Sequence, residues 1–176
     1  MSAADHLPLA CRAARASDHP ALLRLNAASQ AVLSPLDERR LQDLVARADW
    51  LDVVDRGGEV LAFLMAFREG ADYDSPNYRW FARRYPRFLY IDRVVVAQAA
   101  RGRGCGSLLY QRAFERARSH GVPSVTCEFD LEPPNPASAR FHARFGFREV
   151  GRQQYGPLRK TVSLQEADSG PDRKTV

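Results

Sequence analysis

Residues 93–121, RVVVAQAARGRGCGSLLYQRAFERARSHG, decide the fold of this chain. The run of valines predicts a strand, and the segment after Gly106 predicts a helix that Gly121 ends. Between them, glycines alternate at positions 102, 104 and 106. Because glycine has no Cβ, such a turn lets another group come close to the backbone. The turn therefore predicts a close partner, which is a nucleotide, a phosphate group or a neighbouring strand.

Two well-known phosphate-binding turns do not fit these glycines. A Walker A loop needs a lysine directly after its last glycine, and the lysines of this chain are Lys160 and Lys174. A Rossmann fingerprint needs the spacing GxGxxG, and Ser107 stands at the position of its third glycine. Glu128 imitates the ribose-binding acid of that fingerprint, but too little sequence remains for a dinucleotide-binding sheet. The sequence argues against both designs.

A third design fits the turn better. The pattern R/Q-x-x-G-x-G/A, placed between a strand and a helix, matches the residues from Arg101 to Gly106. Successive backbone N–H groups at the positive end of a helix dipole can hold a pyrophosphate without a metal. Arg101 and Arg103 add positive charge. Tight packing at a helix start would explain one glycine but not three, so the pattern favours a pyrophosphate cradle.

The order of the expected elements indicates a mixed α/β (α+β) sheet. Hairpin strands come first, a strand–helix–strand unit follows, and a strand pair ends the chain, which predicts helices on both faces rather than an all-parallel sheet. We expect one domain over residues 1–168 and a flexible tail over residues 169–176. Strands are expected at 9–16, 50–55, 59–67, 88–97, 122–130, 147–155 and 158–165, helices at 17–33, 34–48, 105–120 and 133–145, and a long aromatic connection at 68–87.

Composition narrows the class of protein. The formal charge is +5, carried almost wholly by arginines spread along the chain, so it gives little support to nucleic-acid binding. No apolar run approaches the roughly 18–20 residues of a membrane span. Three cysteines without a CxxC pair argue against a disulfide framework or a zinc site and favour a reducing cytoplasm. We expect no metal, no membrane and no nucleic acid as partners.

A second motif extends the pattern. Residues 134–151, PNPASARFHARFGFREVG, are similar to the segment N-x-x-S/A-x-x-Y/H-x-x-x-G-F of the GNAT superfamily of acyl-CoA-dependent N-acetyltransferases. With the glycine turn at the expected spacing, the chain resembles this family. The resemblance implies a mostly antiparallel sheet of about six to seven strands, about four flanking helices and a central βαβ unit for the cofactor.

The resemblance also implies which residues bind the cofactor, acetyl-CoA or CoA. The strand residues Val94, Val95 and Val96 would offer backbone groups to the pantetheine arm. Asn135 would bond the same arm; its alternative role is to cap the helix that Pro136 begins. The pyrophosphate would lie on Arg101, Gly102, Arg103, Gly104, Cys105, Gly106 and Ser107.

Acetyl transfer to an amine needs a base and an acid. An alkylamine with a pKa of about 10.4 is protonated near neutrality and must lose a proton before it attacks. His142 stands where the family commonly has a tyrosine, and it is a candidate acid, a candidate base or a plain surface residue. Asp92, in the strand before the valines, and Glu128, in the next strand, are candidate bases. The sequence does not choose between them.

The acceptor site is expected in the second helix region and the long connection. Acidic and aromatic residues there suit a cationic acceptor through ion pairing and cation–π contact, while the alternative is that the aromatic rings turn inward and cover the sheet. Tyr90 shares a strand face with Asp92. The candidate acceptor-binding residues are Asp72, Tyr73, Asp74, Tyr78, Trp80 and Tyr90.

The resemblance implies a cytoplasmic acetyltransferase that acts on a primary amine of a small molecule or peptide. It also suggests a homodimer. Three alternatives stay open at this point. One is a CoA-binding regulatory module without turnover, and another is an acyltransferase that uses a different acyl-CoA or a hydroxyl acceptor. The third is a basic nucleic-acid-binding domain, whose affinity would fall steeply with salt.

Overall fold

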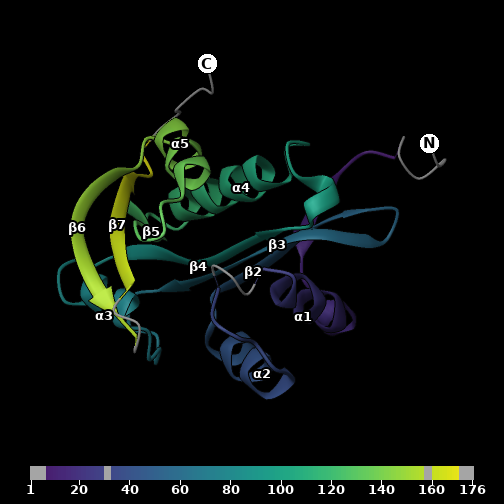
Figure 1. Ribbon diagram of the computed structural model, residues 1–176, viewed down its shortest axis with the longest axis horizontal. Helices are drawn as coiled ribbons and strands as arrows, with labels where there is room; N and C mark the ends of the chain where they lie inside the picture. Colours follow the sequence, from purple (N-terminus) through teal and green to yellow (C-terminus); the bar gives the residue numbers. More distant parts are fainter. Residues whose placement is uncertain (1–6, 30–32, 157–159, 171–176) are drawn as a thin grey trace. The chain divides into compact units, whose positions relative to one another are not determined.

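The computed structural model describes residues 7–29, 33–156 and 160–170 (Figure 1). Within them lie seven strands and five α-helices, which confirms the expected mixed fold with one helix more than predicted. The strands are β1 (Ala10–Ala13), β2 (Trp50–Arg56), β3 (Glu59–Arg68), β4 (Phe88–Val96), β5 (Ser124–Asp130), β6 (Arg148–Tyr155) and β7 (Lys160–Asp168). The α-helices are α1 (His19–Ala27), α2 (Glu38–Arg47), α3 (Pro76–Ala82), α4 (Cys105–Ser119) and α5 (Pro136–Arg144).

The strands follow the order β1-β2-β3-β4-β5-β7-β6. Strands β4 and β5 pair in parallel around α4, which is the predicted βαβ unit, and the pairs β1–β2, β2–β3, β5–β7 and β6–β7 are antiparallel. The chain forms two compact units. Unit 1 holds residues 1–67 and 93–112, and unit 2 holds residues 68–92 and 113–176.

Unit 1 is built on the β2–β3 hairpin. Gly57 and Gly58 have φ angles of +59° and +89°, so the predicted Gly-Gly turn provides the left-handed backbone that a tight hairpin needs. Helices α1 and α2 pack together beside the hairpin (Figure 1). Their residues Leu22, Leu41 and Leu44 are fully buried. The helix α1 is shorter than the predicted 17–33, and residues 30–32 of that prediction lie outside the described residues.

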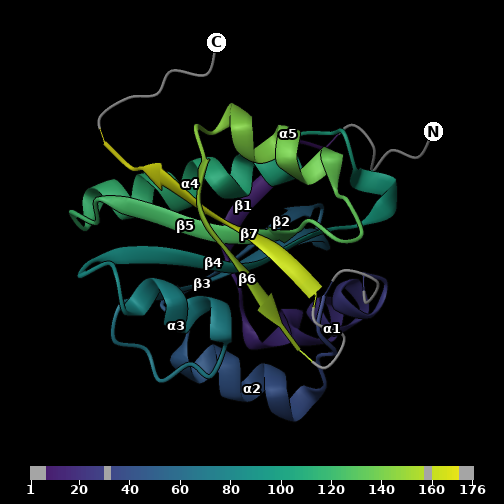
Figure 2. The same ribbon diagram turned by 60° about the vertical axis from the view of Figure 1, so that its left-hand side comes forward.

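Unit 2 is built on β5, β7 and β6, which lie side by side (Figure 2). The tail predicted to begin at residue 169 has a buried first residue. Ser169 donates its backbone N–H to the carbonyl of Pro123 over 2.8 Å and its hydroxyl to the carbonyl of Val122. Residues 171–176 of that tail lie outside the described residues.

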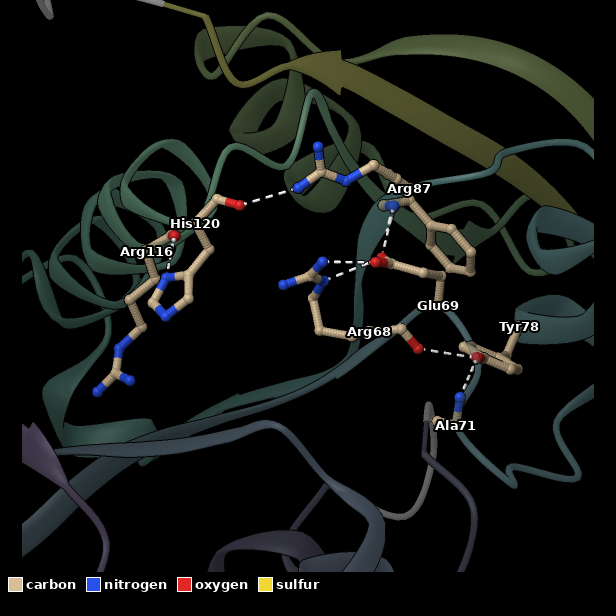
Figure 3. Close-up of polar contacts among 8 residues, drawn as sticks. Arg68, Glu69, Ala71, Tyr78, Arg87, Arg116 and His120 are labelled. Atoms are coloured by element: carbon tan, nitrogen blue, oxygen red, sulfur yellow. Dashed lines mark hydrogen bonds and ion pairs between the residues drawn. The ribbon is translucent and has the colours of Figure 1, made fainter.

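The additional helix, α3, lies in the connection that was predicted without regular structure. Ser75 caps it by accepting the N–H of Tyr78, and Pro76 occupies its first turn, which is a favourable helix start. The hydroxyl of Tyr78 donates to the carbonyl of Arg68 and accepts the N–H of Ala71 (Figure 3). The connection is therefore a folded segment tied to the end of β3.

Glu69 links the two ends of the same connection. Its carboxylate accepts two hydrogen bonds from Arg68 and one from the backbone N–H of Phe88, at 2.5, 2.9 and 3.0 Å (Figure 3). The arginine and the backbone N–H outweigh partial burial and lower the pKa of Glu69. The first residue of β4 is thereby held to the end of β3, which fixes where the strand that carries Tyr90 and Asp92 begins.

Candidate active site

The glycine turn lies in unit 1, between β4 and α4. Gly102 and Gly104 have φ angles of +74° and +86°, a left-handed region that other residues rarely adopt. A Cβ at either position would meet no atom of the described residues within 4 Å, so the space above the turn is open. The first N–H groups of α4 have no partner within the helix and carry the positive end of its dipole.

The side chains around the turn are compatible with the binding of an anion such as a pyrophosphate. Arg101 and Arg103 are exposed, whereas Cys105 is buried. Burial raises the pKa of the Cys105 thiol, so this side chain is not a thiolate near neutral pH. Val94 and Val96 share the half-buried face of β4, and Val95 lies on the buried face. The residues of this turn fit a pyrophosphate.

Asn135 lies in unit 2 and caps α5. Its Oδ1 accepts the backbone N–H of Ser138 over 3.0 Å, so the capping alternative describes this side chain. Its bond to the pantetheine arm stays a prediction.

His142 is a buried ring rather than a surface residue, with 4% of its surface exposed. It stacks on Phe129 at 5.5 Å and meets Phe147 edge-on at 5.3 Å. Its Nδ1 lies 2.8 Å from the carbonyl of Ser138, which only accepts, so Nδ1 carries the hydrogen. Burial lowers the pKa of His142, and the ring is neutral near pH 7.

We expect His142→Phe to keep the fold and to reduce acid sensitivity. The folded protein holds His142 neutral while the unfolded chain protonates it, so the free energy of unfolding falls as the pH drops below about 6.5. A phenyl ring fills the same space and removes that proton uptake. Urea unfolding at pH 8 and pH 5 measures the effect, with the exposed His120→Gln as control. An undiminished acid loss in His142→Phe would contradict this assignment.

Glu128 and Asp92 lie together in unit 2. The Oε1 of Glu128 accepts the hydroxyl of Tyr90 over 2.9 Å and the Nδ2 of Asn77 over 3.0 Å. Its Oε2 is buried without a hydrogen-bond partner among the described residues, although other atoms of the residue are partly exposed. Asp92 accepts the hydroxyl of Tyr73 over 2.5 Å.

The surroundings of Glu128 change its proton affinity strongly. Burial, and after it the charge of Asp92, raise the pKa of Glu128 from 4.5 to about 8. Burial also raises the pKa of Tyr90, so this phenol keeps its proton and remains a donor. Glu128 can therefore hold or release a proton close to neutral pH, which is the property that a general base or acid needs.

The expected acceptor residues divide by exposure. Tyr73, Tyr78 and Tyr90 are buried, and their ring centroids lie 5.6–6.5 Å apart, so the inward-facing alternative describes these rings. Asp72 and Asp74 are exposed. The roles of all five residues in acceptor binding stay predictions.

Trp80 is half-buried on α3, with its ring edge-on to Phe81 and the guanidinium of Arg84 3.9 Å above it. A Cβ at Gly151 of β6 would lie 2.5 Å from Cζ2 of Trp80, so the glycine at this position leaves room for the indole. These contacts describe a packed ring, and its role in acceptor binding also stays a prediction.

Asn77 and Gln153 were missed from the sequence. Asn77 bonds Glu128, and Gln153 donates its Nε2 to the Oδ1 of Asn77 over 2.9 Å. Asn77 follows the Ser-Pro start of α3, a signal that could have located the helix but not the partner of the amide. Nothing in the sequence marks Gln153.

The described residues offer two further observations about partners. No three His, Cys, Asp or Glu side chains gather there as metal ligands would. No helix in the same ranges has the length and apolar content to cross a membrane.

A family profile and several curated proteins match parts of this chain. The profile described as the acetyltransferase (GNAT) family matches residues 20–147. Phosphinothricin N-acetyltransferase of Streptomyces coelicolor is 48% identical over 58 residues, which are 33% of this chain and 33% of that protein. The matched segments span 33% to 52% of the length of the curated relatives.

Solved structures match over nearly their whole length. Ribosomal-protein-alanine N-acetyltransferase of Brucella melitensis has a TM-score of 0.70 at 25% identity, over 90% of this chain and 99% of that one. A protein of Salmonella typhimurium solved with its cofactor acetyl-CoA has a TM-score of 0.71 at 20% identity, over 95% and 99%. Because the Salmonella protein is only 20% identical to this chain, its likeness extends to the fold alone.

Proposed function

Because the chain belongs to the acetyltransferase (GNAT) family, we propose that it transfers acetyl from acetyl-CoA to a primary amine of a small molecule or peptide, by direct attack of the amine. The observation that carries the proposal is the open, left-handed turn at Gly102 and Gly104 before α4. Such a turn binds a pyrophosphate without a metal.

Three groups of residues would hold the cofactor. Arg101 to Ser107 would cradle its pyrophosphate, the backbone of Val94 to Val96 would pair with the pantetheine arm, and Asn135 would bond that arm. Bound acetyl-CoA supplies an activated thioester. His142 is a buried neutral ring, which supports a role in shaping the site over a role as proton donor.

Glu128 would remove the proton from the acceptor. A cationic amine beside Glu128 and Asp92 lowers the pKa of a carboxyl that is otherwise held near 8, because opposite charges favour the ionised form. Oε2 of Glu128 would take one proton from the ammonium group, and the thiol product would carry away the second. Asp92 contributes negative charge that attracts the acceptor.

The acceptor would therefore bind as a protonated, cationic amine. The named reactions of two similar proteins, on phosphinothricin and on a ribosomal-protein alanine, support a small-molecule amine or a peptide terminus. The family resemblance supports a homodimer, and three cysteines that form no disulfide with one another support a cytoplasmic location.

We expect acetyl-CoA and CoA to raise the melting temperature, and NAD and duplex DNA to leave it unchanged. A ligand at 100 times its dissociation constant stabilises the folded state by about 2.7 kcal/mol. Thermal melting with each ligand measures this, and an amine screen with thiol detection follows. No shift with either CoA compound would contradict the proposal. A shift without turnover on any amine would favour the CoA-binding regulatory module, and turnover only with another acyl-CoA or a hydroxyl would favour the other acyltransferase.

A further inference from the structure

We propose that Asn77 is a positioning residue that occupies Oε1 of Glu128, so that the carboxyl exchanges its proton at Oε2. Gln153 acts through Asn77 in the same arrangement. This inference rests on the proposed acetyl transfer for its consequence in catalysis. Three hydrogen bonds carry it, together with one buried oxygen that has no partner among the described residues.

The orientation of the Asn77 amide follows from its two partners. Gln153 donates Nε2 to Oδ1 of Asn77, and the Nδ2 of Asn77 therefore faces Oε1 of Glu128. The reversed amide would place its oxygen against the carboxyl oxygen of Glu128 and its nitrogen against the donor of Gln153. Asn77 is 3% exposed, so water does not readily replace either bond.

Two donors then converge on one oxygen of Glu128. The amide of Asn77 and the hydroxyl of Tyr90 both give their hydrogens to Oε1. A proton on Oε1 would compete with these two hydrogens for the lone pairs of that oxygen. The proton of the neutral carboxyl accordingly lies on Oε2, the oxygen without a partner among the described residues. Oε2 is thus the carboxyl oxygen that no donor of the described residues engages.

The arrangement draws one residue from each of four elements. Asn77 comes from α3, Tyr90 from β4, Glu128 from β5 and Gln153 from β6. Apart from the bond between Glu128 and Tyr90 on paired strands, the network is independent of the backbone ladder. It sets the side-chain position of Glu128 rather than the strand register, which is what a positioning role requires.

Several titratable or charged groups act around Glu128. Asp92 on β4 and Asp130 on β5 raise its pKa, whereas the bonds from Tyr90 and Asn77 lower it. Tyr73 lies against Asp92, Cys127 of β5 is buried with a raised pKa, and Lys160 of β7 pairs with Asp130 at 3.5 Å. Among these influences, the Asn77 bond can be removed without a change of charge.

The test is the titration of Glu128 in variants of this network. Asn77→Ala removes a donor to a charged carboxylate, so the midpoint should rise by about one pH unit. Gln153→Ala leaves Asn77 in place but unheld, so its midpoint should rise by less. Ser163→Ala is the matched control, because this buried residue also donates to a carboxylate, that of Glu149, and should leave the midpoint unchanged.

Two readouts separate this inference from the proposed function. Infrared difference spectra follow the carbonyl band of protonated Glu128 with pH, and the band is assigned by its loss in Glu128→Gln. The pH dependence of kcat/KM follows the same group in turnover. An upward shift in both supports the inference. An unchanged infrared midpoint in Asn77→Ala overturns it, and the milder Gln153→Ala decides if Asn77→Ala does not fold. Absence of wild-type turnover would count against the proposed function alone.

Discussion

Glu128→Gln should lower kcat by a factor of about 10²–10⁴, the usual contribution of a positioned general base. Glutamine keeps an oxygen that accepts from Tyr90 and Asn77, but it cannot take a proton from the acceptor. Acetyl-CoA should still raise the melting temperature of the variant, because the cradle is unchanged. Steady-state kinetics with an amine acceptor measures the loss. Full turnover in the variant would remove Glu128 from the mechanism and leave Asp92 as the base.

The same substitution should stabilise the protein, and the gain should grow with pH. Below pH 4.5 both states hold the Glu128 proton. Between 4.5 and about 8 the unfolded chain releases it and the folded protein does not, so the free energy of unfolding of the wild type falls as pH rises. That fall is about 4–5 kcal/mol, and Glu128→Gln removes it.

Urea unfolding of wild type and Glu128→Gln at pH 4 and pH 8 measures this gain. Glu149→Gln is a control of opposite sign. The hydroxyl of Ser163 lowers the pKa of Glu149, so the folded state favours the ionised carboxylate. Replacing this carboxylate by an amide therefore cannot stabilise the protein as pH rises. Equal stability of wild type and Glu128→Gln at both pH values would show that the carboxyl is not held neutral.

Gly104→Val should abolish the stabilisation by acetyl-CoA. The side chain would enter the open space above the turn, and the loss of two charge-assisted N–H bonds at about 1.5–3 kcal/mol each lowers affinity by roughly 10²–10⁴-fold. Valine at a φ of +86° also strains the backbone by about 1–2 kcal/mol, so some loss of stability accompanies the loss of binding.

Gly58→Val separates the two effects. Gly58 has a φ of +89° and open space at its Cβ, as Gly104 does, but it lies in the β2–β3 hairpin. Both variants should lose similar stability without ligand, and Gly104→Val alone should lose the response to acetyl-CoA. Calorimetric titration and thermal melting measure these quantities. Equal cofactor affinity in both variants would place the pyrophosphate elsewhere.

Local signals in the sequence predicted the fold well. The glycine turn and the hairpin at Gly57 and Gly58 depend on backbone conformations that only glycine adopts freely, so they are visible in a single chain. Helix α3 was missed because its start, Ser75-Pro76, lay within a segment without a long apolar period. The burial of His142 was also missed, since ring packing against Phe129 depends on where β5 runs.

The carboxylate network could be predicted only in part. Asp92 was expected because an acid within an apolar strand is unusual, and Glu128 was expected as the carboxyl on the following strand. The bond between Asn77 and Gln153 joins residues 76 positions apart in the chain, and their meeting depends on the order of β5, β7 and β6. Periodicity assigns residues to faces of a strand, but it does not say which distant strand becomes a neighbour.

The buried carboxyl of Glu128, whose pKa is raised to about 8, has a practical consequence for anyone who engineers this protein. A library screened only for heat resistance at alkaline pH would enrich neutral residues at position 128. Each of them removes the loss of unfolding free energy that the glutamate causes as pH rises. The most robust clones would then be the inactive ones. Selection for stability should be coupled to turnover, or carried out near pH 4, where the folded and unfolded states both hold the Glu128 proton.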